Sequence, residues 1–203
     1  MDHAVAEAIE SAKKDMGEAG LGWSNGICNV NVNCDIETSC GWWIGNNPDA
    51  YSNHQMTVLR VTTPGGALKG LFVSFGMKPA VIDNAGRAGN QRLVSAEVAG
   101  FFCRKMEENY RVPVIYAVSA GGNQMPRKTA LRSSVTNEGA VIEQDLGVVQ
   151  GLAYAREQGD EVCKYAYEAK REETIAAYRK ARAEGSELPQ LAPQWVLDMM
   201  AEN

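Results

Sequence analysis

A strand, a helix and a second strand follow one another in the middle of this 203-residue chain, and their order limits the fold more than any other feature. Residues 68–77 (LKGLFVSFGM) and 112–119 (VPVIYAVS) are rich in the β-branched and aromatic residues typical of strands. Between them, residues 93–110 carry apolar residues at helical spacing, and Ser95 is the expected cap. A strand, helix and strand in this order form a parallel βαβ unit with a right-handed crossover.

Both strands of this unit end in small and polar residues. Because the carboxyl ends of parallel strands meet at one edge of the sheet, where open α/β sheets bind ligands, we expect the two loops to be neighbours. Glycines allow tight turning and close approach there, and we assign Glu97, Gly121 and Gly122 a structural role at the site. A polar turn without a ligand is the alternative. The candidate ligand-binding residues are Lys78, Asp83, Asn84, Asn123, Gln124 and Arg127.

The rest of the chain predicts a further set of elements around this unit. Pro64-Gly65-Gly66 predicts a hairpin turn before residue 68. The other expected elements are a helix at 2–18, strands at 27–34 and 56–63, a helix at 141–183 broken near 158–160, and a short helix at 194–200 anchored by Trp195. We therefore predict an α/β fold with a mixed sheet, helices packed on it and a helical C-terminal region. We expect one domain, with residues 1–140 as the α/β core and 141–203 as the helical region packed on it.

Composition narrows the class of protein. The net charge of −5 and the lack of a basic stripe argue against nucleic acid as a partner. No apolar run approaches the ~18 residues of a membrane span, and the start does not resemble a signal peptide. Five cysteines without disulfide or zinc spacing indicate reduced thiols and a cytoplasmic protein, with Cys103 in the core. Trp42-Trp43 is interpreted as an aromatic plug, with a pocket wall as the alternative.

The order of motifs resembles the N-terminal domain of neutral/alkaline non-lysosomal ceramidases and their bacterial relatives. The resemblance covers roughly residues 5–170. The matching pieces are the N-x-N strand at Asn31–Asn33, the turn and strand at Tyr51–Arg60, the strand Gly70–Gly76 followed by Met77-Lys78-Pro79, the segment Leu93–Gly100, and the segment Ser119–Arg127. The resemblance implies a zinc-dependent amidohydrolase, in which a metal-bound water attacks an amide carbonyl.

The departures from the family pattern fall on its zinc chemistry. Lys78 stands where the family has a zinc-ligating histidine, and a protonated lysine cannot ligate zinc. Glu97 and Asn123 stand where the family has aspartates, and Met125 where true ceramidases have serine. The family's earlier His-x-His block and its later acidic and tyrosine ligands have no counterpart, and His54 is interpreted as a surface or turn histidine. We therefore expect no zinc cofactor.

Three hypotheses follow for the function. The first is a ceramidase-like, non-catalytic relative that binds a small anionic ligand at loops 78–84 and 121–127. The second is a metal-free hydrolase of amides or esters that uses Lys78 as an electrophile or base. The third is a subunit completed by a partner chain or by a second copy in a homo-oligomer, with an exposed apolar seam. The alternative role for Lys78 is an ion pair with Asp83 or Glu97 that only joins two loops.

Overall fold

The structure is a computed structural model that describes residues 2–86, 93–136 and 138–184. The chain begins with α1 (Asp2–Lys14), β1 (Gly20–Ile27), β2 (Asn31–Thr38), β3 (Gly41–Asn47), β4 (Gln55–Thr62) and β5 (Leu68–Phe75). It continues with α2 (Glu97–Tyr110), β6 (Val114–Val118), β7 (Gln124–Pro126), β8 (Leu131–Val135), β9 (Val141–Asp145) and α3 (Gly147–Glu184).

The main sheet has four strands in the order β1-β4-β5-β6. Its antiparallel hairpin β4–β5 is connected through the predicted Pro64–Gly66 turn. β5 and β6 are parallel, pairing Leu71 with Val114 and Phe75 with Val118, and α2 connects them. The predicted α/β class, with a parallel βαβ unit in a mixed sheet, is confirmed.

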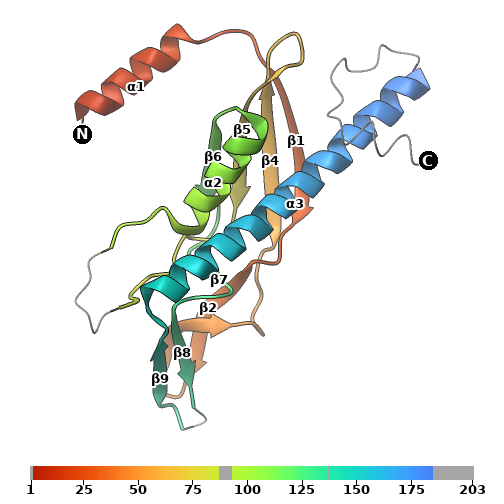
Figure 1. Cartoon of the computed structure of the whole chain (residues 1–203). Helices are drawn as coiled ribbons and strands as arrows, with labels where there is room; N and C mark the ends of the chain where they lie inside the picture. The colour runs from red at the N-terminus through yellow and green to blue at the C-terminus, as the bar shows by residue number, and fades with distance from the viewer. Residues whose placement is uncertain (1, 87–92, 137, 185–203) are drawn as a thin grey trace.

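Helices α2 and α3 lie together against one face of this sheet (Figure 1). The core is formed by alternate strand residues and by the inner sides of the two helices, because strand side chains alternate between faces. Each large apolar side chain buried here contributes roughly 1.5–3 kcal/mol. The fully buried residues of this core include Met56, Val73, Phe75, Phe102 and Val162. Cys103 is partly buried against this core, as predicted.

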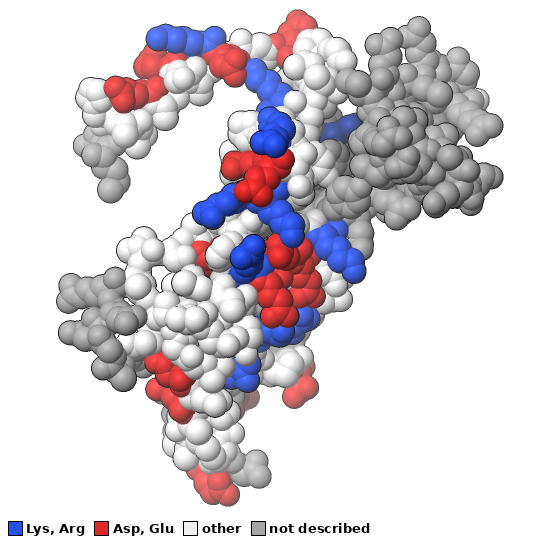
Figure 2. Space-filling model, in the orientation of Figure 1, with Lys and Arg blue, Asp and Glu red and all other residues white. Residues whose placement is uncertain are grey.

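The outer side of the helices is a mixed-charge surface (Figure 2). Lys and Arg alternate with Asp and Glu along it, and the ion pairs Lys105–Asp160 (2.6 Å) and Lys128–Glu157 (2.5 Å) join α3 to other segments. Each of these exposed ion pairs contributes little to stability, and the charged side chains leave this face exposed to solvent.

A second sheet and a hairpin lie beyond the carboxyl ends of β5 and β6 (Figure 1). The sheet has the order β3-β2-β7, and the hairpin is β8–β9. The predicted strand over 27–34 is wrong, because β1 ends at Ile27 and β2 begins at Asn31. The alternation of apolar and polar residues predicted one buried and one exposed face, but Asn31 and Asn33 are buried along with Val32.

The predicted helix over 141–183 differs from the structure in two ways. Residues 141–145 form β9, whose Val141 pairs with Val135 of β8, and the helix begins only at Gly147, where φ is +81°. The expected break near 158–160 does not occur. Gly159 serves close packing instead, since a Cβ there would lie 2.9 Å from the Cβ of Phe101 on α2.

Helix α1 is shorter than the predicted 2–18 and leaves its apolar side chains in solvent. Val5 and Ile9 are 53% and 51% exposed, and Lys69 on β5 binds Asp15 just after the helix (3.1 Å). The predicted helix at 194–200 with Trp195 lies outside the described residues. Among the helices that the structure describes, none combines the length and apolar character needed to cross a membrane.

Candidate functional site

The parallel pair β5–β6 brings the two predicted loops into contact. The Ser119 N–H donates to the Phe75 carbonyl (3.1 Å), so the strands remain paired to their ends. Beyond this point, the Lys78 ammonium donates to the Gly122 carbonyl (3.2 Å). The expectation that the two loops are neighbours is confirmed.

A buried amide network supports this edge of the sheet. Asn31 is 1% exposed, and its Nδ2 lies within hydrogen-bond distance of the carbonyls of Asn53 (2.8 Å) and Gly76 (3.0 Å) and of Gln124 Oε1 (3.1 Å), so two of these acceptors share one of its two hydrogens. These acceptors fix the orientation of the amide, so Asn31 Oδ1 accepts from His54 Nδ1 (2.7 Å). His54 is therefore a half-buried network member rather than a surface histidine.

Gln124 and Asn123, neighbours in the second loop, differ in burial. Gln124 is 2% exposed and donates from Nε2 to Asn123 Oδ1 (3.0 Å), so it belongs to the supporting network. Asn123 is exposed, and its carbonyl accepts from the Cys34 N–H (2.9 Å). Of these two candidates, only Asn123 presents its side chain at the surface.

Lys78 is half-buried at the meeting point of the loops. Its Nζ lies 3.2 Å from the Gly122 carbonyl and 3.8 Å from Cys34 Sγ. Burial raises the pKa of the Cys34 thiol, and the positive charge of Lys78 opposes that rise. In the part of the chain that the structure describes, Lys78 makes no ion pair with Asp83 or Glu97. An ammonium has three donors, so one is left for another partner.

Glu97 anchors the loop that follows β5. Glu97 is buried, at 6% exposure, and its carboxylate accepts from the N–H groups of Val81 (2.5 Å) and Ile82 (3.0 Å). Burial raises the pKa of this carboxyl, and the two backbone hydrogen bonds partly offset the rise. Glu97 also has φ of +44°, a strained value for a non-glycine residue. The predicted cap Ser95 is wrong, because α2 begins at Glu97 rather than at residue 93 and its N-cap is Ala96. Ser95 precedes the cap, and its hydroxyl accepts from the Glu97 N–H (3.0 Å).

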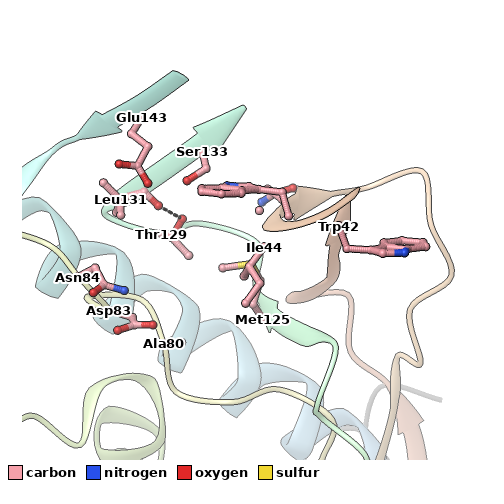
Figure 3. A pocket seen from close by; sticks show the side chains of 13 residues that line it. Trp42, Ile44, Ala80, Asp83, Asn84, Met125, Thr129, Leu131, Ser133 and Glu143 are labelled. Carbon is pink, nitrogen blue, oxygen red and sulfur yellow. Dashed lines mark hydrogen bonds between the residues drawn. The ribbon is translucent and has the colours of Figure 1, made fainter. Parts of the chain in front are cut away.

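Asp83 and Asn84 are exposed at the tip of this loop, where Asn84 adopts a left-handed φ of +59°. They border a cavity of about 410 Å³ between the loop and strands β3, β7, β8 and β9. Figure 3 shows Asp83 and Asn84 entering from one side and Glu143 and Ser133 from the β8–β9 hairpin. The lining residues are Trp42, Trp43, Ile44, Gly45, Asn46, Ala80, Asp83, Asn84, Met125, Thr129, Leu131, Ser133 and Glu143.

The tryptophan pair forms part of this cavity wall. Trp42 and Trp43 are 70% and 42% exposed, so the predicted aromatic plug is wrong and the alternative of a pocket wall holds. A second, more open hollow of about 650 Å³ contains Lys78 and Glu97 and shares Ala80, Asp83 and Asn84 with the first. The loop after β5 therefore borders both hollows.

Arg127 does not join Lys78 at the edge of the sheet. Its guanidinium donates to the Asn29 carbonyl (2.6 Å) and to both carboxylate oxygens of Glu161 on α3 (3.1 and 3.2 Å). Both contacts to Glu161 come from Nη2, and Nη1 donates to Asn29, so the two terminal nitrogens bind different segments of the chain. Arg127 thus connects the end of β7 to α3.

The side chains at this edge do not fit a zinc ion. Lys78 lies where the two loops meet, its ammonium contacts Gly122 and Cys34, and an ammonium has no lone pair to offer a metal. Across residues 2–86, 93–136 and 138–184, no group of three or more His, Cys, Asp or Glu side chains is placed to hold a metal. No metal-dependent step can be derived from these residues.

Two solved ceramidases share the architecture now described. Neutral ceramidase from Pseudomonas aeruginosa superposes with a TM-score of 0.56 and 19% identity, covering 81% of this chain and 24% of that one. A ceramidase complexed with C2 gives a TM-score of 0.54 and 19% identity, covering 79% of this chain and 23% of that one. The fold is ceramidase-like.

This likeness concerns the fold alone, because the identity is low and the chain spans about a quarter of the length of each ceramidase. No family model and no curated protein matches the sequence. The ceramidase-like scaffold places Lys78 and the double glycine together. The sequence predicted no role at the site for Asn31, and His54 was interpreted as a surface or turn histidine. The N-x-N pattern of β2 was the signal that pointed to Asn31.

Proposed function

We propose that this chain is a ceramidase-like binding domain that does not hydrolyse amides through zinc and that holds a small anionic group at Lys78. The observation that carries the proposal is the position of the ammonium where the two loops meet. Among residues 2–86, 93–136 and 138–184, Gly122 and Cys34 accept from two of its donors, which leaves the third for a ligand.

The surroundings of Lys78 strengthen such an interaction. Lys78 as a residue is half-buried, and a hydrogen bond from its charged ammonium to an anion is stronger than one between neutral groups. The hollow beside it also contains the exposed side chains of Asp83 and Asn84, which suit a ligand with a hydroxyl or amine next to its anionic group. A small hydroxy acid or amino acid has this combination. Arg127 has no part in the proposal, since Glu161 holds it elsewhere.

Calorimetric titration with lactate, glycine and inorganic phosphate tests this role. Lys78→Met should weaken binding of the anion by at least about tenfold, which is 1.4 kcal/mol, and Lys78→Arg should retain part of it. Lys69→Met is the matched control, because Lys69 lies on β5, the strand that precedes Lys78, but binds Asp15. Equal binding by wild type and Lys78→Met would remove the proposal, as would one zinc per purified chain.

A hydrolase that uses Lys78 without a metal, or that is completed by a partner chain, is the competing proposal. Turnover of a nitrophenyl ester or anilide by the purified chain, lost in Lys78→Met and unchanged in Lys69→Met, would favour the metal-free hydrolase. Turnover only after addition of a second polypeptide would favour the completed subunit. The binding proposal requires that neither is seen.

The 410 Å³ cavity suggests a second class of ligand. Asp83, Glu143 and the tryptophan pair border it, and none of its lining residues is lysine or arginine. Carboxylates and aromatic faces both attract organic cations. Titration with tetramethylammonium tests this candidate, and binding should fall in Asp83→Asn but not in Lys78→Met.

A further inference from the structure

The four-stranded sheet has a second face, opposite the one that α2 and α3 cover. Strand registers place Trp23, Leu59, Phe72 and Ile115 in one row across all four strands. Neighbouring residues in each strand, such as Val58 and Val73, point to the helical core, so this row points the other way. The row is apolar from β1 to β6.

This open face is exposed to solvent along both edges. Trp23 and Leu21 on β1 are 67% and 64% exposed, Ile27 is 61% exposed, and Ile115 on β6 is 56% exposed. The inner positions Leu59, Val61 and Phe72 are partly exposed. The other open-face positions are Asn25, Gln55, Thr57, Gly70, Ser74 and Ala117. Asp, Glu, Lys and Arg are absent from all of these positions.

The size of this face approaches that of a dimer interface. A tryptophan carries about 150–250 Å² of surface, so these side chains together expose on the order of 500 Å² of apolar area. A standard interface takes about 800 Å² from each partner, and the polar positions around the row supply further area. The largest apolar patch on a typical monomer covers about 300–600 Å² and is often functional, and this face lies in that range.

We propose that a second copy of this chain packs its own sheet face to face against this one, giving a dimer with layers in the order α/β/β/α. The chain has a net charge of −5, so two copies repel wherever their acidic surfaces approach. The uncharged face is the surface on which two identical copies meet without like-charge contacts. Sheet-on-sheet packing about 10 Å apart lets the inner side chains interdigitate.

A two-fold axis along the strands gives this dimer complementary edges. Such an axis reverses the strand order between the copies, so β1 of one copy lies over β6 of the other. The large Trp23 side chain then meets the smaller Ile115 of the partner subunit twice in the dimer. A charge introduced at Ile115 would be buried against Trp23 at both places.

Sedimentation equilibrium of the full chain tests the dimer. We expect wild type to dimerise and Ile115→Lys to raise the dissociation constant by at least about tenfold, because a buried lysine lacks a partner. Ile142→Lys is the matched control, since Ile142 on β9 is an isoleucine with 55% exposure away from this sheet. A monomer at every concentration, or equal weakening by both variants, would overturn the dimer.

Hydroxyl-radical footprinting of wild type keeps the test decisive if Ile115→Lys fails to fold. Trp23 and Trp42 have nearly equal exposure in the single chain, at 67% and 70%. In the dimer, Trp23 should lose reactivity as concentration rises, while Trp42 should not. Trp23 protected in a monomer would show that another part of the same chain covers the face, and reactive Trp23 in an oligomer would place the interface elsewhere. Either result would overturn the proposal.

Discussion

Glu97 shows how one residue can be structural at a site where its charge suggests chemistry. It begins α2, yet its carboxylate reaches back to the N–H groups of Val81 and Ile82 and fixes the loop that carries Asp83 and Asn84. Its positive φ is tolerated because these hydrogen bonds and the one to Ser95 hold it in place. The loop geometry at the candidate site therefore depends on a residue that the ligand need not touch.

Glu97→Gln should destabilise the protein in a pH-dependent way. At neutral pH it replaces an acceptor oxygen with a donor facing a backbone N–H, which should cost about 1–3 kcal/mol. The pKa of Glu97 is raised in the folded state, so its contribution is complete below the unfolded pKa and falls as pH rises through the folded pKa. The wild-type advantage over Glu97→Gln should therefore shrink as pH rises through that range. Urea unfolding across pH measures it, with the exposed Glu108→Gln as control, and an advantage that grew with pH over that window would contradict the raised pKa.

Helix α3 is the element that joins the two parts of the fold. In the first third of the helix, fully buried Gln158 exchanges hydrogen bonds with the backbone of Lys128, accepting from its N–H and donating to its carbonyl (2.9 Å each). Glu157 and Glu161 bind Lys128 and Arg127 on either side. Together these contacts attach the segment after β7 to the helix that also packs on α2.

Gly159 should be intolerant of even one added methyl group. Gly159→Ala gains about 1 kcal/mol of helix propensity but places a Cβ 2.9 Å from Phe101 Cβ and 3.2 Å from the Val98 carbonyl. Overpacking of this kind costs about 1–3 kcal/mol, so we expect net destabilisation and separation of α2 from α3. Thermal unfolding measures it, with the exposed Gln150→Ala on the same helix as control. A rise in Tm for Gly159→Ala would show that the helices do not pack this closely.

On the scale of the whole molecule, Asn31 connects the two sheets. It lies in β2 of the three-stranded sheet, and its side chain binds the Gly76 carbonyl just after β5 of the four-stranded sheet. The same amide reaches Gln124 and His54, so four segments meet around one side chain. The relative position of the loops at the candidate site is set through this network.

Asn31→Ala should destabilise the fold by about 3 kcal/mol or more, because it leaves buried carbonyls and the Gln124 side chain without their donor. It should also weaken any ligand binding at Lys78, since the two loops lose their common support. Urea unfolding and the calorimetric titration measure the two effects. Asn109→Ala, at an exposed position of α2, is the control and should change stability by less than about 0.5 kcal/mol. An equally small change for Asn31→Ala would contradict the role of the network.

The sequence by itself determined the parallel βαβ unit and the meeting of its two loops. Local periodicity identifies a strand or helix, and the handed connection of parallel strands then brings their carboxyl ends together without knowledge of any other contact. This was enough to place Lys78 beside Gly122. The same reasoning identified the hairpin before it, whose Pro-Gly-Gly turn is a local signal.

Only the tertiary structure decided which partners the polar residues took. Arg127 binds Glu161 on a distant helix, Asn31 is buried among four segments, and Val141 enters a strand because β8 lies beside it. Gly159 remains helical because α2 lies too close for a side chain. The residue pattern along the chain indicates helices, strands and turns, because these depend on neighbouring residues. Hydrogen-bond and packing partners depend on segments that meet only when the whole chain has folded.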